Sequence, residues 1–306
     1  PLYYIDLELG KNHPDLDVEA CLIDVTDCTR LDEIFKLHKP SRVFHAAAYK
    51  HVPMMEGHPL AAVHNNVLGT WLVAKAAGEH GTKRFILVST DKAVCPANVM
   101  GATKRIAELV TLYLQDLYPK TAFGAVRFGN VLGSSGSVIP IFKSQIEAGE
   151  PLTVTHEEIT RFFMTIPEAV QLILQASLLP EIKGGIAMLE MGEPVPILEL
   201  AKNLLRLSGK SALLGRDILI TGLRPGEKLH EELAAPDEKA IQTGIEKVNL
   251  LDTSVARLPE SIAQAIEEER IEEGTGYLRA EIMAVDLEAD VALDGEKPIA
   301  QMVGSD

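Results

Sequence analysis

Short apolar runs alternate with helical segments over the first 130 residues, and this alternation limits the possible folds more than any other feature. Predicted strands at 19–24, 42–46, 85–89 and 121–127 are separated by predicted helices at 30–38, 59–80 and 99–118, and another helix is predicted at 1–10. In 99–118 the apolar residues recur at helical spacing, and Pro119 ends the helix. This rhythm predicts an α/β fold with a doubly wound parallel sheet.

The rhythm changes after about residue 131. Turns rich in glycine and serine then separate short strands at 152–155 and 187–191 from helices at 167–179 and 197–208. We therefore expect a first domain at 1–130, a smaller lobe at 131–250 interleaved with it, and an acidic tail at 251–306. A helical pattern at 261–273 falls in this tail, which we expect to be solvated and to which we assign no function.

Composition narrows the class of protein. The 306 residues carry a net charge of −15, which argues against a nucleic-acid surface. No apolar run reaches the length of a membrane helix, and no signal peptide pattern opens the chain. The three cysteines, at 21, 28 and 95, lack the spacing of a disulfide framework or a zinc site. A reducing cytoplasm is the expected setting.

Three different proton-handling groups follow the apolar run 85–88. They are Thr90, Asp91 and Lys92, at a position where the carboxyl end of a parallel strand usually meets a ligand. Met100 and Lys104 lie one helical turn apart, so they share a helix face. These residues suggest acid–base chemistry. A surface ion pair between Asp91 and Lys92 and a solvent-facing Lys104 are the plainer alternatives.

Several long motifs in a fixed order carry a family resemblance. The sequence resembles the nucleotide-sugar 4,6-dehydratases of the extended short-chain dehydrogenase/reductase superfamily, and the resemblance covers roughly residues 1–249. Met100 stands where most of the superfamily has tyrosine, as in the large, membrane-anchored subgroup that acts on UDP-N-acetylglucosamine. The matching motifs are HAAAYKHVPMME at 45–56, NNVLGT at 65–70, STDKAV at 89–94, NVMGATKR at 98–105, RFGNVLGS at 127–134 and TGLRPGEK at 221–228.

The resemblance implies a Rossmann-type fold, bound NAD (NADP is not excluded) and a UDP-sugar substrate that is dehydrated to a UDP-2-acetamido-2,6-dideoxy-4-hexulose. Because the Met100 thioether cannot exchange protons, the acid–base work passes to its neighbours. Thr90 would bond the C4 hydroxyl, Asp91 would protonate the departing C6 hydroxyl, and Lys92 would take the C5 proton. Lys104 would hold the nicotinamide ribose. The division of roles between Asp91 and Lys92 stays open.

The resemblance also assigns binding residues. Asn130, Arg161, Arg224 and Glu227 would grip the UDP group, with arginines on the pyrophosphate, although surface salt bridging is an alternative for both arginines. Ser134 lies in the turn at 133–137, which is either a flexible connection or a source of amides for phosphate. The expected cofactor residues are Asp24, Val25, Ala46, Ala47, Ala48, Lys50, Asn66 and Lys104.

The glycine-rich fingerprint that opens such a domain is absent, as are the membrane segments of the subgroup. We therefore expect this chain to be part of a longer protein, without the first strands of its sheet, whose parent is anchored at the inner membrane with this part in the cytoplasm. These residues alone should bind NAD poorly. Two alternatives are a nucleotide-sugar epimerase and a catalytically silent nucleotide-binding domain. The pattern does not predict the oligomeric state, and a homo-oligomer stays open.

Overall fold

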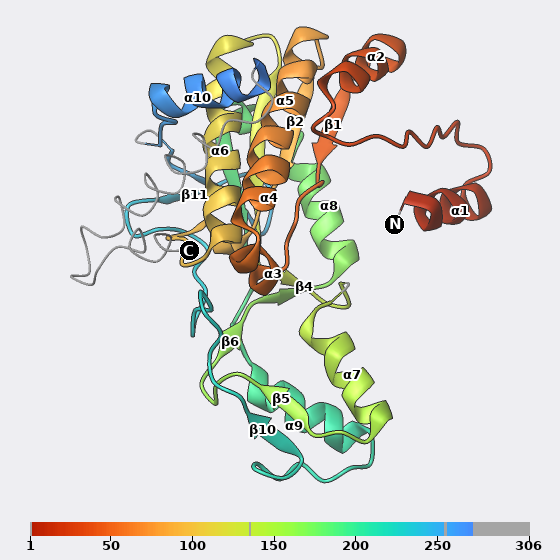
Figure 1. The fold of residues 1–306 in the computed structure, drawn as a ribbon, viewed down its shortest axis with the longest axis vertical. Helices are drawn as coiled ribbons and strands as arrows, with labels where there is room; N and C mark the ends of the chain where they lie inside the picture. Colours follow the sequence, from red (N-terminus) through yellow and green to blue (C-terminus); the bar gives the residue numbers. More distant parts are fainter. Residues whose placement is uncertain (1, 135, 254–255, 272–306) are drawn as a thin grey trace, which may run out of the picture.

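A six-stranded sheet forms the centre of the molecule, in the order β1-β2-β3-β8-β12-β11 (Figure 1). The computed structural model describes residues 2–134, 136–253 and 256–271. The parallel strands are β1 (Arg42–His45), β2 (Arg84–Val88), β3 (Ala122–Arg127) and β8 (Gly185–Leu189). The strands β12 (Val248–Leu251) and β11 (Ala240–Gln242) complete the sheet in antiparallel pairing. The α/β prediction with a mainly parallel sheet is confirmed.

Helices cover both faces of this sheet because alternate strand residues point to opposite sides. Phe85 and Leu87 share a core with α2 (Cys28–His38), α5 (Gly69–Glu79), α6 (Val99–Leu117) and α10 (Glu260–Ile271), whereas Ile86 packs with α8 (Ile166–Ala176) and the short helix η3 (Pro180–Ile182). The predicted helix at 59–80 is three consecutive pieces, α4 (Pro59–Val63), the π-helical η1 (His64–Leu68) and α5. The short helix α3 (Val52–Gly57) precedes them.

The smaller lobe has a core of its own. It contains α7 (Val138–Ala148), β5 (Leu152–Val154), α9 (Ile197–Leu207) and β10 (Ile218–Ile220), and β10 pairs with β5. Phe142, Leu152 and Ile218 are fully buried there. Two small pairs lie between this lobe and the sheet: β4 (Asn130–Val131) with β7 (Phe163–Met164), and β6 (Thr160–Arg161) with β9 (Val195–Pro196) (Figure 1).

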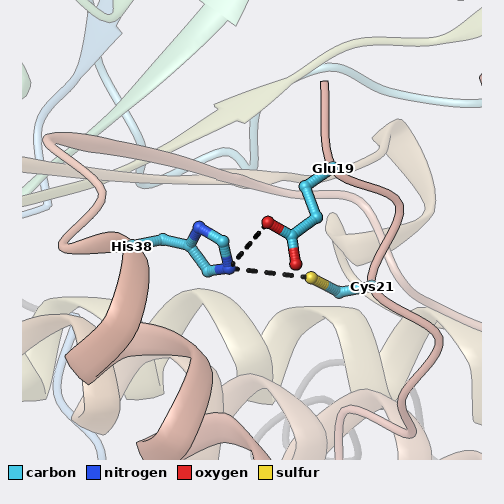
Figure 2. Close-up of side chains that lie close together, drawn as sticks. All are labelled: Glu19, Cys21 and His38. Carbon is cyan, nitrogen blue, oxygen red and sulfur yellow. Dashed lines mark hydrogen bonds and ion pairs between the residues drawn. The ribbon is translucent and has the colours of Figure 1, made fainter. Parts of the chain in front are cut away.

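The amino-terminal segment differs from the prediction in one respect. The helix expected at 1–10 is present as α1 (Leu2–Asn12), with no buried side chain, but residues 19–24 do not form the predicted strand. A strand needs a backbone partner, and within the described ranges no strand pairs with the outer edge of β1. The segment instead lies against α2, where His38 Nε2 is 3.7 Å from Glu19 Oε2 and 4.0 Å from Cys21 Sγ (Figure 2).

The expectation of a solvated tail after residue 251 is wrong for its first part. Helix α10 packs on the same face as α5 and α6, and Leu258, Ile262 and Ile266 are buried. These residues recur every four positions and so lie on one side, which packs against the core while the acidic residues of the helix stay on the other side. Residues 272–306 lie outside the described residues. None of the helices in the described part of the chain is long and apolar enough to cross a membrane.

Candidate functional site

A cavity of about 460 Å³ opens at the carboxyl ends of β1, β2 and β3 and extends to the smaller lobe. This is the edge of an open α/β sheet at which ligands usually bind. The strand ends contribute Ala46 and Ala48, Thr90 and Lys92, and Gly129 and Asn130, while the smaller lobe and the segments beside it contribute Ile197, Arg161, Arg224 and Glu227. Residues from both parts of the chain that were singled out in the sequence therefore line one cavity.

Thr90, Asp91 and Lys92 form a tight turn at the end of β2. The Thr90 hydroxyl caps the short helix η2 (Asp91–Ala93), and the backbone N–H of Asp91 donates to the carbonyl of Phe128 at 2.9 Å. Asp91 is fully buried, and its Oδ1 accepts from Thr90 Oγ1 and from Lys92 Nζ, both at 2.9 Å. Thr90 and Lys92 line the cavity, whereas Asp91 lies behind them. Asp91 Oδ2 has no hydrogen-bond partner within the described residues.

Lys92 has two further oxygen neighbours. Asn130 Oδ1 lies 3.2 Å from its Nζ, and Glu231 Oε1 lies 3.6 Å away. Glu231 is buried and does not line the cavity. Sequence reasoning missed this residue because nothing in the run HEEL at 230–233 distinguishes it from Glu232, which is exposed.

Met100 and Lys104 lie on the buried face of α6, which Asn98 caps by accepting from the backbone N–H of Gly101. Both side chains line the cavity. Lys104 Nζ donates to the carbonyl of Val88 at 2.7 Å, and burial lowers the pKa of Lys104 to about 8. The amine therefore exchanges its proton far closer to neutral pH than an exposed lysine does.

The expected cofactor residues divide into two groups. Ala46, Ala48 and Lys50 line the cavity beside Lys104. Asn66 is buried next to them, where its side chain bonds the backbone N–H and carbonyl of Tyr49 and the hydroxyl of Thr103. It therefore fixes the loop after β1.

Ala47, Asp24 and Val25 do not line the cavity. The Asp24 side chain is exposed and accepts from the N–H and hydroxyl of Thr26, which together lower the pKa of Asp24. Val25 packs against Gly69. Asp24 and Val25, two of the expected cofactor residues, are therefore not joined to the cavity in this structure.

The expected UDP residues all line the cavity: Asn130, Ser134, Arg161, Arg224 and Glu227. The surface salt bridge considered for Arg161 is wrong, because this residue is only 8% exposed. Its guanidinium donates to the carbonyls of Thr160 and Leu229 and to Glu227 Oε1. Arg224 is exposed, and its backbone N–H donates to Glu227 Oε2 at 3.2 Å.

A network of buried ion pairs lies next to the site and connects the elements that carry it. Ser89 donates to Glu108, which binds Arg127 through two hydrogen bonds, and Arg127 also binds Glu238. Burial alone would raise the pKa of Glu108, but the charge and hydrogen bonds of Arg127, with help from Arg105 and Ser89, lower it to about 2. The network joins the end of β2, α6 and β3 to the segment that carries Glu238.

Comparison with known proteins matches residues 2–253 to a family model described as polysaccharide biosynthesis protein. The capsular polysaccharide biosynthesis protein CapD of Staphylococcus aureus is 53% identical over 250 residues, which make up 81% of this chain and 41% of that protein. A UDP-glucose 4-epimerase of Rickettsia rickettsii is 35% identical over 237 residues, 77% of this chain and 67% of that protein. The chain thus spans about two fifths of the length of CapD.

Solved structures share the fold. The Pen protein of Bacillus thuringiensis is 32% identical, with a TM-score of 0.73, over 82% of this chain and 76% of that one. DesIV of Streptomyces venezuelae, a dTDP-glucose 4,6-dehydratase solved with NAD and DAU bound, is 21% identical, with a TM-score of 0.66, over 75% and 74% of the two chains. At that identity the likeness to DesIV concerns the fold alone.

Proposed function

This chain belongs to the polysaccharide biosynthesis protein family, and we propose that it carries the acid–base and UDP-binding residues of an enzyme that dehydrates UDP-N-acetylglucosamine across C5 and C6. One observation supports this proposal above the others. Thr90, Lys92 and Lys104 meet in a single cavity with Arg224 and Glu227, and the family relationship extends over nearly the whole described chain.

The residues beside Lys104 fit the nicotinamide end of NAD⁺. Ala46 and Ala48 leave the backbone open to a flat ring system, and Lys104 offers an amine of lowered pKa. Bound NAD⁺ would supply a reversible hydride acceptor, so that the hydride lost from C4 is regained at C6 and the net reaction is the loss of one water. DesIV was solved with NAD bound, which agrees with this assignment for the shared fold. Lys104 would hold the ribose and add positive potential to the cavity.

The elimination itself is assigned to the turn after β2. Oxidation at C4 would make the C5 proton acidic, and Lys92, which lines the cavity, would remove it. The C6–O bond then breaks, and the departing hydroxyl takes a proton and leaves as water. Transfer of a proton from Lys92 Nζ to Asp91 Oδ1, which are 2.9 Å apart, would leave Lys92 as a neutral base and Asp91 as the acid. Asp91 would then pass this proton to the C6 oxygen through Thr90 Oγ1, which lies 2.9 Å from Asp91 Oδ1 and whose residue lines the cavity.

Mass spectrometry provides the direct test. The full-length protein that contains this sequence is incubated with NAD⁺ and UDP-N-acetylglucosamine, and the loss of one water from the sugar nucleotide is followed. Asp91→Asn should abolish the loss of water while UDP binding is retained. Asp116→Asn, an exposed change on the same fold, serves as the control. Folded, cofactor-bound protein that releases no water would contradict the proposal.

A UDP-sugar 4-epimerase is the second candidate, because the Rickettsia relative carries that name. An epimerase inverts C4 without losing water and needs no acid for the C6 hydroxyl. A product of unchanged mass with inverted C4, formed equally well by Asp91→Asn, would favour the epimerase. Membrane anchoring of the full-length protein, with this part on the cytoplasmic side, remains part of the proposal for the dehydratase.

A further inference from the structure

A buried carboxylate lies directly behind Lys92. The Glu231 side chain is 4% exposed, and its Oε1 is 3.6 Å from Lys92 Nζ and 3.8 Å from Arg161 Nε. An ionised carboxylate at such depth is costly unless cations are close to it. The position of Glu231 is therefore tied to two residues of the candidate site, one from each side of the cavity.

The surroundings of Lys92 explain what this carboxylate does. In its ammonium form Lys92 has three N–H donors, and three side-chain oxygens face its Nζ, from Asp91 at 2.9 Å, Asn130 at 3.2 Å and Glu231 at 3.6 Å. These oxygens come from the turn after β2, from β4 and from the segment after β10. Together these three contacts fix the position of Lys92 Nζ.

We propose that Glu231 is a positioning residue that holds Lys92 in place for proton removal and couples it to Arg161 on the other side of the cavity. The inference rests on the dehydration proposed above. Among the described residues, the basic side chains of Lys92 and Arg161 contact the acidic side chains of Asp91 and Glu231, and Glu227 also binds Arg161. Because Lys92 becomes an ammonium when it takes the C5 proton, the negative charge of Glu231 also favours that transfer.

The test compares Glu231→Gln with Glu232→Gln in the full-length protein, since Glu232 is an exposed neighbour in the same segment. A misplaced base costs orders of magnitude in rate, so we expect kcat of Glu231→Gln to fall at least ~10-fold. The KM for UDP-N-acetylglucosamine should change by less than ~3-fold, because ground-state binding is retained. In Glu231→Gln the acid limb of the pH–rate profile should move to lower pH than in the wild type. In Glu231→Asp, which keeps the negative charge, the acid limb should return to its wild-type position.

A second readout does not depend on activity. Acetic anhydride is applied at limiting amounts, and acetylation of Lys92 is quantified by mass spectrometry. The amine should react faster in Glu231→Gln than in the wild type, and Glu232→Gln should match the wild type.

The outcomes separate the two proposals. If the wild type releases no water, the dehydratase proposal fails, while the acetylation rates still decide whether Glu231 controls Lys92. If the wild type is active and Glu231→Gln behaves as Glu232→Gln in both assays, the positioning role is overturned. A rise in KM with kcat unchanged would also overturn it, because Glu231 would then serve Arg161 alone.

Discussion

Removing the charge of Arg127 offers a severe test of how the site is supported. Arg127 is fully buried at the end of β3, with Nη2 2.8 Å from Glu108 Oε2 and Nη1 2.6 Å from Glu238 Oε2. In Arg127→Met the new side chain still fills much of the buried space, but all hydrogen-bond donors of the guanidinium are lost. Glu108, which is also fully buried, then retains the hydrogen bonds from Arg105 and Ser89.

Breaking a buried ion pair typically costs about 3–5 kcal/mol, because an uncompensated charge stays inside. Arg105 still compensates part of the charge, so we expect the lower end, about 3 kcal/mol. At ~2–4 °C per kcal/mol for a chain of this size, Tm should fall by about 10 °C. Arg30→Met is the matched control, since Arg30 and Glu33 form an exposed pair and such pairs contribute less than about 1 kcal/mol.

The assay is urea unfolding followed by the fluorescence of Trp71, the single tryptophan, which is 2% exposed in the core of α5. The pH dependence adds a second criterion. Because the folded-state pKa of Glu108 is lowered to about 2, its stabilisation is present above the usual carboxyl range and is lost as pH falls toward 2. The difference between wild type and Arg127→Met should therefore shrink in acid. Equal stability of the two Met variants, or a difference that does not vary with pH, would refute this reasoning.

Two further changes test the geometry around α6. Gly101→Ala should destabilise the protein by about 2 kcal/mol, because the new Cβ would lie 2.2 Å from the carbonyl oxygen of Lys92. Gly57→Ala is the control, because a Cβ at Gly57 has no neighbour within 4 Å and should leave the stability unchanged. Thermal unfolding of the two variants measures the difference. Lys104→Met should raise Tm at neutral pH, since burial lowers the pKa of Lys104 to about 8. That advantage should narrow as pH rises from about 8 toward the unfolded-state value of about 10.4, because the folded wild type has then already lost the buried charge. A Tm difference that is constant between pH 7 and 10 would contradict it.

The elements that could be predicted from the sequence are those whose own residues determine where they begin and end. The run 85–88 stops abruptly at Ser89, and the turn of polar residues after it is where the sheet places its cavity. The helix at 99–118 is recognisable from its own spacing and from Pro119, and it ends at Leu117 in the structure. Such features need no knowledge of distant residues.

Features that depend on a distant partner could not be predicted in the same way. Residues 19–24 have strand composition, but a strand forms only against another backbone. Arg127 and Glu238 are 111 residues apart in sequence, and no spacing rule joins them. The burial of Asp91 likewise brings its carboxylate close to Gly129, where a Cβ would lie 3.2 Å from Asp91 Oδ2 and 2.8 Å from Phe162 Cβ.

The charge of the cavity shows why net charge is a poor guide to ligand class at a site. The chain is acidic overall, with a net charge of −15, yet the proposed nucleotide diphosphate would meet local cations in the cavity. Of the two arginines, Arg161 already donates to two carbonyls and to Glu227. Arg224 is exposed at the cavity, and Glu227 holds its backbone in place. A bound diphosphate is therefore expected to pair with Arg224, while Arg161 shapes the wall against which the nucleotide lies.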